Sequence, residues 1–207
     1  MPHRRRSVPL AERYVSRSSG DLRRGVVVLE FILAMPVFFI LTLAIFEFTF
    51  VMLTLQVGHT ALIEGTRRAA EVFPPNLPLD DPGADDDIVD QVVEVMNAYL
   101  IVQGLEIYDT TQGATDDLTL ANARIIVERA DDLPVTRGDS VTFPGGYTCT
   151  ASGPDPTINE VRVTLCYPLV DSSDPSGCPR PVGDWLSTFG FSIADYVFET
   201  SSRMLLE

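Results

Sequence analysis

Two carboxylates interrupt an apolar stretch near the start of the chain. Between residues 26 and 55 only Glu30 and Glu47 carry ionisable side chains, and most of the other residues are aliphatic or aromatic. A run of this length crosses a hydrocarbon core of about 30 Å as one helix. An ionised side chain placed in lipid costs at least about 2.5 kcal/mol unless a partner is supplied. Each glutamate therefore needs either a partner or a place at the membrane boundary.

The first carboxylate follows a glycine at the end of a basic leader. Gly25 stands after two arginines, and Glu30 and Phe31 follow it within the apolar run. If the chain is cut after Gly25, the new amino group lies on Val26, four residues before Glu30 and on the same face of the helix. The pairing of that amine with the carboxylate would remove the unpaired charge. The alternative places Glu30 at the inner headgroup boundary of an ordinary anchor helix that is never cut.

The depth of the second carboxylate follows from helix length. From Val26 to Glu47 an α-helix rises roughly 32 Å at about 1.5 Å per residue. Glu47 is then expected near the outer interface, where no charge is buried. If the span instead covers residues 31–55, Glu47 lies inside the bilayer and must pair with a partner helix. We favour the first placement, which leaves an apolar surface beyond the membrane formed by Phe48, Phe50, Met52 and Leu55.

Small residues recur beyond the membrane segment. Residues 58–73 are compatible with a continued helix until a proline pair ends it. Ala61, Gly65 and Ala69 lie at intervals of four, and such a stripe lets another helix or a sheet approach closely. The partner is either another subunit or the chain's own domain, and the sequence does not decide between them.

Three cysteines offer a second kind of chemistry. Cys149, Cys166 and Cys178 all follow the apolar run, in the part expected to be exported, where disulfides form and persist. Three single pairings are possible, and we slightly favour Cys149 with Cys166, across a hairpin turned by the intervening Gly and Pro residues. A zinc site is not expected, because structural zinc needs four Cys or His ligands and the only histidines are His3 and His59.

Charge is divided by the apolar run. Residues 1–25 hold seven Arg and two acidic residues, a net charge of +5, whereas the whole chain carries −14. Cationic flanks are retained in the cytoplasm, so the N-terminus is expected inside and the acidic remainder outside. The chain has no Lys. Nucleic-acid binding is not expected, because it relies on Lys and Arg neutralising phosphates.

The exported part lacks the residues of common catalytic sites. It holds no Lys, and its only His is His59, close to the membrane segment. A nucleophile needs a base beside it, so Ser-His and Cys-His sites are excluded. The adjacent acids at 116–117 and 131–132 are expected to be exposed loop pairs, and the aspartates of the 74–87 loop do not follow the order of an EF-hand. No enzyme activity and no cofactor are expected.

The motifs together resemble a known family. Gly25 followed by Glu30 and Phe31 is similar to the prepilin processing motif, in which a peptidase cuts after the glycine on the cytoplasmic side. Further similarity lies in Glu47 with Phe48 and in the Glu-Gly-Thr-Arg block at 64–67. This combination resembles the TadE-like family, minor pseudopilins of the tight adherence (type IVc) pilus system. The resemblance implies that Glu30 pairs with the amino terminus of its own or a neighbouring subunit and orients its incorporation into a filament.

The expected architecture is α+β. A long N-terminal transmembrane helix should lead into a small antiparallel sheet with one further helix, over residues 87–103 and ending at Gly104. Strands are predicted at 118–128, 160–167 and 196–206, with a short one at 147–150. The domains are a basic cytoplasmic leader (1–25), the transmembrane helix and its continuation (26–73), an acidic Pro-rich linker (74–87) and an exported α+β domain (88–207).

The function that follows from these predictions is structural. We expect a minor pseudopilin-like protein for assembly of a type IVc pilus or a related secretion apparatus, cut after Gly25 and located in the bacterial inner membrane. Its expected partners are the lipid bilayer, a prepilin peptidase, other pilin or pseudopilin subunits and inner-membrane assembly proteins. The alternative is an uncleaved single-pass anchored protein whose acidic ectodomain binds an extracellular partner or divalent cations.

Overall fold

The computed structural model describes residues 19–73, 86–107, 122–130, 133–138, 143–151, 153–171 and 180–206. The leader up to residue 18, most of the acidic linker, the acidic pairs at 116–117 and 131–132, and Cys178 lie outside the described residues. The chain forms two compact units, Met1–Leu41 and Thr42–Glu207. The helix α1 (Ser19–Val72) begins in the first unit and ends in the second.

The described part of the first unit is helical and apolar. Every side chain from residue 26 to residue 39 is exposed, although nearly all of them are hydrophobic. The stretch Val26–Val72 is long and apolar enough to cross a membrane. Pro36 lies inside the helix, and transmembrane helices tolerate such a proline because neighbouring groups can satisfy the freed carbonyl. These features fit the predicted transmembrane helix.

A four-stranded antiparallel sheet forms the centre of the second unit, in the order β2-β1-β3-β6. The strands are β1 (Arg124–Arg129), β2 (Val135–Arg137), β3 (Glu160–Pro168) and β6 (Val197–Leu205). The short strands β4 (Val170–Asp171) and β5 (Arg180–Pro181) pair separately. Three 3-10 helices complete the described elements: η1 (Ile101–Gln103), η2 (Pro144–Gly146) and η3 (Trp185–Phe189).

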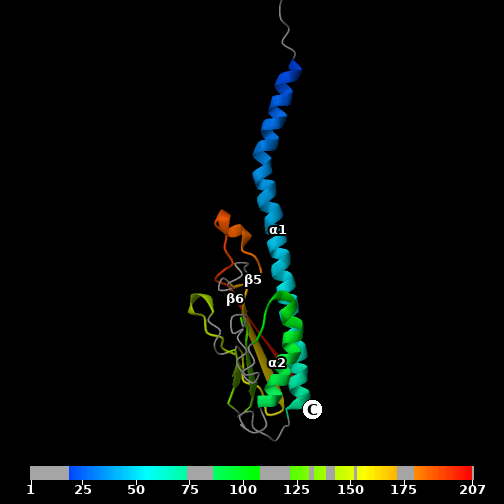
Figure 1. Cartoon of the computed structure of the whole chain (residues 1–207), viewed down its shortest axis with the longest axis vertical. Coiled ribbons are helices and arrows are strands. Elements are labelled where there is room, and N and C mark those ends of the chain that lie inside the picture. Colours follow the sequence, from blue (N-terminus) through cyan, green and yellow to red (C-terminus); the bar gives the residue numbers. More distant parts are fainter. Residues whose placement is uncertain are drawn as a thin grey trace, which may run out of the picture. The chain divides into compact units, whose positions relative to one another are not determined.

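Two helices cover one face of this sheet. The second helix, α2 (Asp86–Leu100), lies beside the C-terminal part of α1 (Figure 1, green and teal). Alternate residues of β3 enter the core beneath them, and all four are fully buried: Val161, Val163, Leu165 and Tyr167. This confirms the face predicted from the sequence. After η1 the chain turns at Gly104, whose positive φ of 70° is the left-handed conformation that glycine adopts without strain.

The other face of β3 is buried as well, which the sequence did not predict. Cys166 packs with Cys149, Phe143 and Ile126 in a second, smaller core. The side chain of Arg162 is 2% exposed, and its Nε lies 2.6 Å from the Glu128 carboxylate. The same guanidinium donates to the backbone carbonyls at 153 and 154. Residues 143–151 and 153–154 therefore cover this face with polar as well as apolar contacts.

Two details differ from the predicted strands. Residues 147–150 form no strand, because the disulfide and contacts to Glu199 hold them as irregular chain over the sheet. The short edge strand β2 was not anticipated. The predicted 118–128 strand is described only from Asn122 onward, and within that part β1 begins at Arg124.

Candidate membrane and assembly segment

The predicted processing site lies within α1. Since the helix begins at Ser19, the bond between Gly25 and Val26 is flanked by helical residues on both sides. The side chains of Val26, Glu30 and Phe31 are exposed. Val26 and Glu30 are four residues apart, which places them one above the other on the same helix face. Among the residues that the structure describes, Glu30 has no hydrogen-bonding or ionic partner, so its carboxylate remains accessible to an added amino group.

Glu47 has a different environment. Its side chain is buried, at 4% exposure, and its Oε2 accepts a hydrogen bond of 3.0 Å from the backbone N–H of Leu186. Leu186 lies 139 residues later, in η3. The carboxylate is therefore covered by protein rather than exposed, while its depth near the outer interface stays a prediction. Among the described residues, its hydrogen-bonding partner belongs to the chain's own C-terminal region and not to another transmembrane helix.

A compact loop surrounds this contact. The Trp185 and Phe50 rings form a T-shaped pair, with a centroid distance of 5.7 Å and an interplanar angle of 87°. The Asp184 carboxylate accepts hydrogen bonds from Ser192 Oγ at 2.7 Å and from the Ile193 N–H at 3.3 Å. The loop is thus closed on itself and joined to α1 by one polar and one aromatic contact. The single Trp of the chain was a signal that the sequence reasoning left unused.

The small-residue stripe packs against the chain's own domain. Ala61 and Ala69 are fully buried. A Cβ atom on Gly65 would lie 2.5 Å from Cγ of Met96, in α2. Of the two alternatives left open by the sequence, the structure has the intrachain one, and Ala61, Gly65 and Ala69 are not available to a second subunit in this fold. A glycine is required at 65 because the two helices approach closely there.

The comparison with known families concerns this same helix. Residues 25–70 match the model of the TadE-like protein family. This segment is TadE-like. The match begins at Gly25 and includes Glu30, Glu47 and the block at 64–67, so the resemblance predicted from these motifs is confirmed. No curated protein and no solved structure matches the chain. The match suggests a protein associated with Tad pilus systems.

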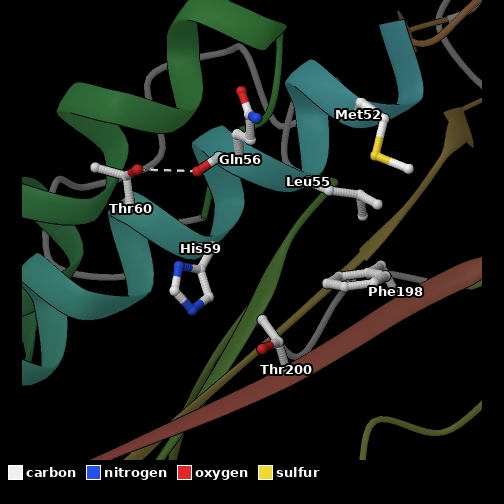
Figure 2. A pocket seen from close by; sticks show the side chains of 7 residues that line it. All are labelled: Met52, Leu55, Gln56, His59, Thr60, Phe198 and Thr200. Carbon is white, nitrogen blue, oxygen red and sulfur yellow. Dashed lines mark hydrogen bonds between the residues drawn. The ribbon is translucent and has the colours of Figure 1, made fainter. Parts of the chain in front are cut away.

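The apolar surface predicted at the end of the TadE-like segment's membrane span is divided among several contacts. Phe48 is exposed, Phe50 packs on Trp185, and Leu55 packs against the main core. Met52 lines an open groove with residues from α1 and from β6, which Figure 2 shows with His59 between the helix and the strand. The lining residues are Met52, Leu55, Gln56, His59, Thr60, Phe198 and Thr200.

The two described cysteines form a disulfide with each other. Cys149 and Cys166 are joined, with their Cα atoms 6.0 Å apart. This is the pairing that the sequence slightly favoured. The Glu199 carboxylate lies close to both sulfurs, but disulfide sulfurs are not the thiolates that bind metals. Glu199 instead accepts hydrogen bonds from the Tyr147 hydroxyl and the Thr150 N–H. Burial and the Glu199 carboxylate together raise the pKa of Tyr147 to about 12.

Tyr167 joins the sheet to the TadE-like helix. Its ring lies against Gly58, where a Cβ atom would collide with the phenol, and its hydroxyl donates to the carbonyl of Thr54 at 3.4 Å. Burial raises the pKa of this phenol, because the charged form would lose its hydration. Gly58 and Thr54 of α1 thus contact Tyr167, which lies in β3 of the sheet.

Proposed function

We propose that the chain is a minor pseudopilin-like structural protein for assembly of a type IVc pilus or a related secretion apparatus. The observation that carries this proposal is the TadE-like match, which starts at Gly25 and contains Glu30 five residues later. Both lie on a helix whose next turns are apolar and exposed. A helix with that surface requires an apolar environment, which a bilayer or a bundle of similar helices supplies.

In the proposed pathway, a prepilin peptidase cuts after Gly25 on the cytoplasmic side of the bacterial inner membrane. The amino group of Val26 then pairs with Glu30 of the same or a neighbouring subunit, which neutralises the charge inside the assembly. The helix remains as a single-pass anchor, with the acidic domain outside because the basic leader is retained inside. Other pilin or pseudopilin subunits and inner-membrane assembly proteins are the proposed partners, and no catalytic role is proposed.

The first experiment is amino-terminal sequencing of the protein from its native membrane, with and without the prepilin peptidase. A start at Val26 that depends on the peptidase supports the proposal. An intact leader in both strains overturns it. That outcome leaves an uncleaved anchored protein whose acidic ectodomain binds an extracellular partner or divalent cations.

Two glycines provide a matched pair of variants for processing. Gly25→Val should block cleavage, because the peptidase is proposed to act at that residue. Gly20→Val changes the other glycine of the leader and should be cut normally. Equal processing of the two variants would place the cleavage elsewhere.

The role of the carboxylate is tested separately from processing. Glu30→Gln keeps the shape of the side chain and removes its charge, so we expect normal cleavage but loss of cross-links to neighbouring subunits. Glu71→Gln, on the same helix but exposed beside Arg67, is the control and should cross-link as the wild type does. Undiminished cross-linking of Glu30→Gln would remove this glutamate from the assembly mechanism.

A further inference from the structure

Exposed aromatic side chains are concentrated in one loop of the second unit. We call residues 184–196 the aromatic loop. Its four aromatic side chains are all exposed, and they are Trp185, Phe189, Phe191 and Tyr196. Large apolar side chains exposed together in one segment indicate a surface that meets another apolar phase.

Two contacts fix the aromatic loop beside one turn of α1, at Glu47 and Phe50. The Leu186 N–H donates to Glu47, and Trp185 forms a T-shaped pair with Phe50. Both contacts fall within one turn of the helix. A buried acceptor that lost this donor would be left unsatisfied, which is costly. The loop therefore cannot move along the helix without leaving the Glu47 carboxylate unpaired.

The position of Glu47 along α1 coincides with the end of a membrane span. The apolar run of the helix begins at Val26, and about 21 residues at 1.5 Å each bring it to Glu47 after roughly 32 Å. A hydrocarbon core is about 30 Å thick. Glu47 thus falls at the outer boundary, where Trp and Tyr side chains are enriched in membrane proteins.

We propose that the aromatic loop inserts its exposed side chains into the outer headgroup boundary of the bilayer, with Glu47 as the residue that positions it. The lipid surface that fits is zwitterionic, since the loop contains Asp184 and Asp195 and the chain carries −14 overall. Binding through aromatic rings should be insensitive to salt. The inference requires membrane anchoring by α1 but neither cleavage nor pilus assembly, so it can stand or fall independently of the proposed function.

The single Trp of the chain makes the proposal directly measurable. The full chain is placed in phosphatidylcholine nanodiscs whose acyl chains carry bromine either close to the headgroup or close to the chain end. Trp185 fluorescence should be quenched about twofold more by the shallow bromine than by the deep bromine, because indole prefers the interface. The quenching should not change with salt concentration.

A matched control moves the tryptophan to the other end of the sheet. Ile158 is 71% exposed and precedes the start of β3, whereas the opposite end of β3 leads to Leu169, which bonds to Tyr196. Nine residues of strand separate the two ends by about 30 Å. The double variant Trp185→Phe, Ile158→Trp should show no quenching by either bromolipid and free access to aqueous acrylamide.

Variants of Glu47 test its positioning role. Glu47→Gln keeps an oxygen that accepts the Leu186 N–H, so bromolipid quenching should be retained. Glu47→Ala removes the acceptor, so quenching by bromine should fall and quenching by acrylamide should rise.

Two results would overturn the proposal. Trp185 quenched by acrylamide and not by bromine would show that the loop lies in water. Trp185 protected from both quenchers would show that protein, such as a second subunit, covers the loop in place of lipid.

Discussion

The two halves of α1 share one helix but differ in what surrounds them. Before Glu47, long apolar side chains are mostly exposed, and Leu33 and Val37 are each 68% exposed. After Glu47, buried positions recur every three or four residues and include Ala61, Leu62 and Ala69. The more hydrophobic half is therefore the less buried one. Hydrophobicity alone does not identify the protein core in a chain that meets a membrane.

Side-chain size separates the halves better than hydrophobicity does. The exposed half is rich in Phe, Leu and Ile, which fill a lipid environment without specific contacts. The covered half places Ala, Gly and Thr where α2 and the sheet approach, and the tightest examples are Gly58 against Tyr167 and Gly65 against Met96. Small residues allow helices to approach closely, so the pattern of small residues marks the half that packs on its own domain.

The largest expected effect comes from one substitution made in each half. Leu62→Ala should lower the free energy of unfolding by roughly 2–5 kcal/mol, because it leaves a cavity in a packed core. Leu62 is only 1% exposed. Leu33→Ala should leave that free energy unchanged. Urea unfolding of the full chain in nanodiscs, followed by loss of the domain's circular dichroism, measures both. Equal losses would contradict the division of the helix.

A charge introduced into the exposed half should affect membrane insertion and leave the stability of the domain unchanged. Val37→Arg places a charge in the middle of the proposed span and should disfavour membrane insertion by about 2.5–3.5 kcal/mol. Stability of the domain should be unaffected, since Val37 makes no core contact. Insertion is measured by glycosylation mapping in microsomes, with Val37→Leu as the control. Full insertion of the arginine variant would argue against a span centred there.

Reduction of the disulfide should destabilise the domain that packs on the second half of α1 and leave the membrane anchor of the first half unaffected. The bond between Cys149 and Cys166 closes a separation of 17 residues, for which chain-entropy arguments give a stabilisation of about 3 kcal/mol. Dithiothreitol should lower the melting temperature of the domain, whereas carbonate should still fail to extract the anchor from membranes. A Cys149→Ser, Cys166→Ser variant should melt at the same lower temperature with or without reductant. A reductant-sensitive melting temperature in that variant would assign the effect to Cys178.

The smallest expected effect is a pH dependence confined to the domain. The pKa of Tyr147 is about 12 in the folded chain, against 10.0 for the free side chain, through burial and then the Glu199 carboxylate. The folded state thus holds the proton more tightly, and the resulting stability is complete below pH 10 and is lost as the pH rises toward about 12. Tyr147→Phe should flatten the unfolding free energy over that interval. A slope equal to that of the wild type would exclude Tyr147 as its origin.

Several elements were predictable because their signals are local. Alternation in β3 assigned Val161, Val163, Leu165 and Tyr167 to one face, and burial confirms it. The end of the second helical segment was expected at Gly104, and a glycine with positive φ follows η1 there. The cover over the opposite face of β3, formed by residues 143–151 and 153–154, was not predicted, since that part of the sequence has no periodic pattern.

What the sequence by itself determined is the apolar span, the position of its two carboxylates, the family resemblance and the principal strands. Each of these depends on composition or on spacing within a short segment. Only the tertiary structure decided that Glu47 is paired with Leu186, that the small-residue stripe packs against α2, and which cysteines are joined. Those outcomes depend on contacts between residues far apart in the chain, and their partners are selected by how the whole domain packs rather than by the residues beside them.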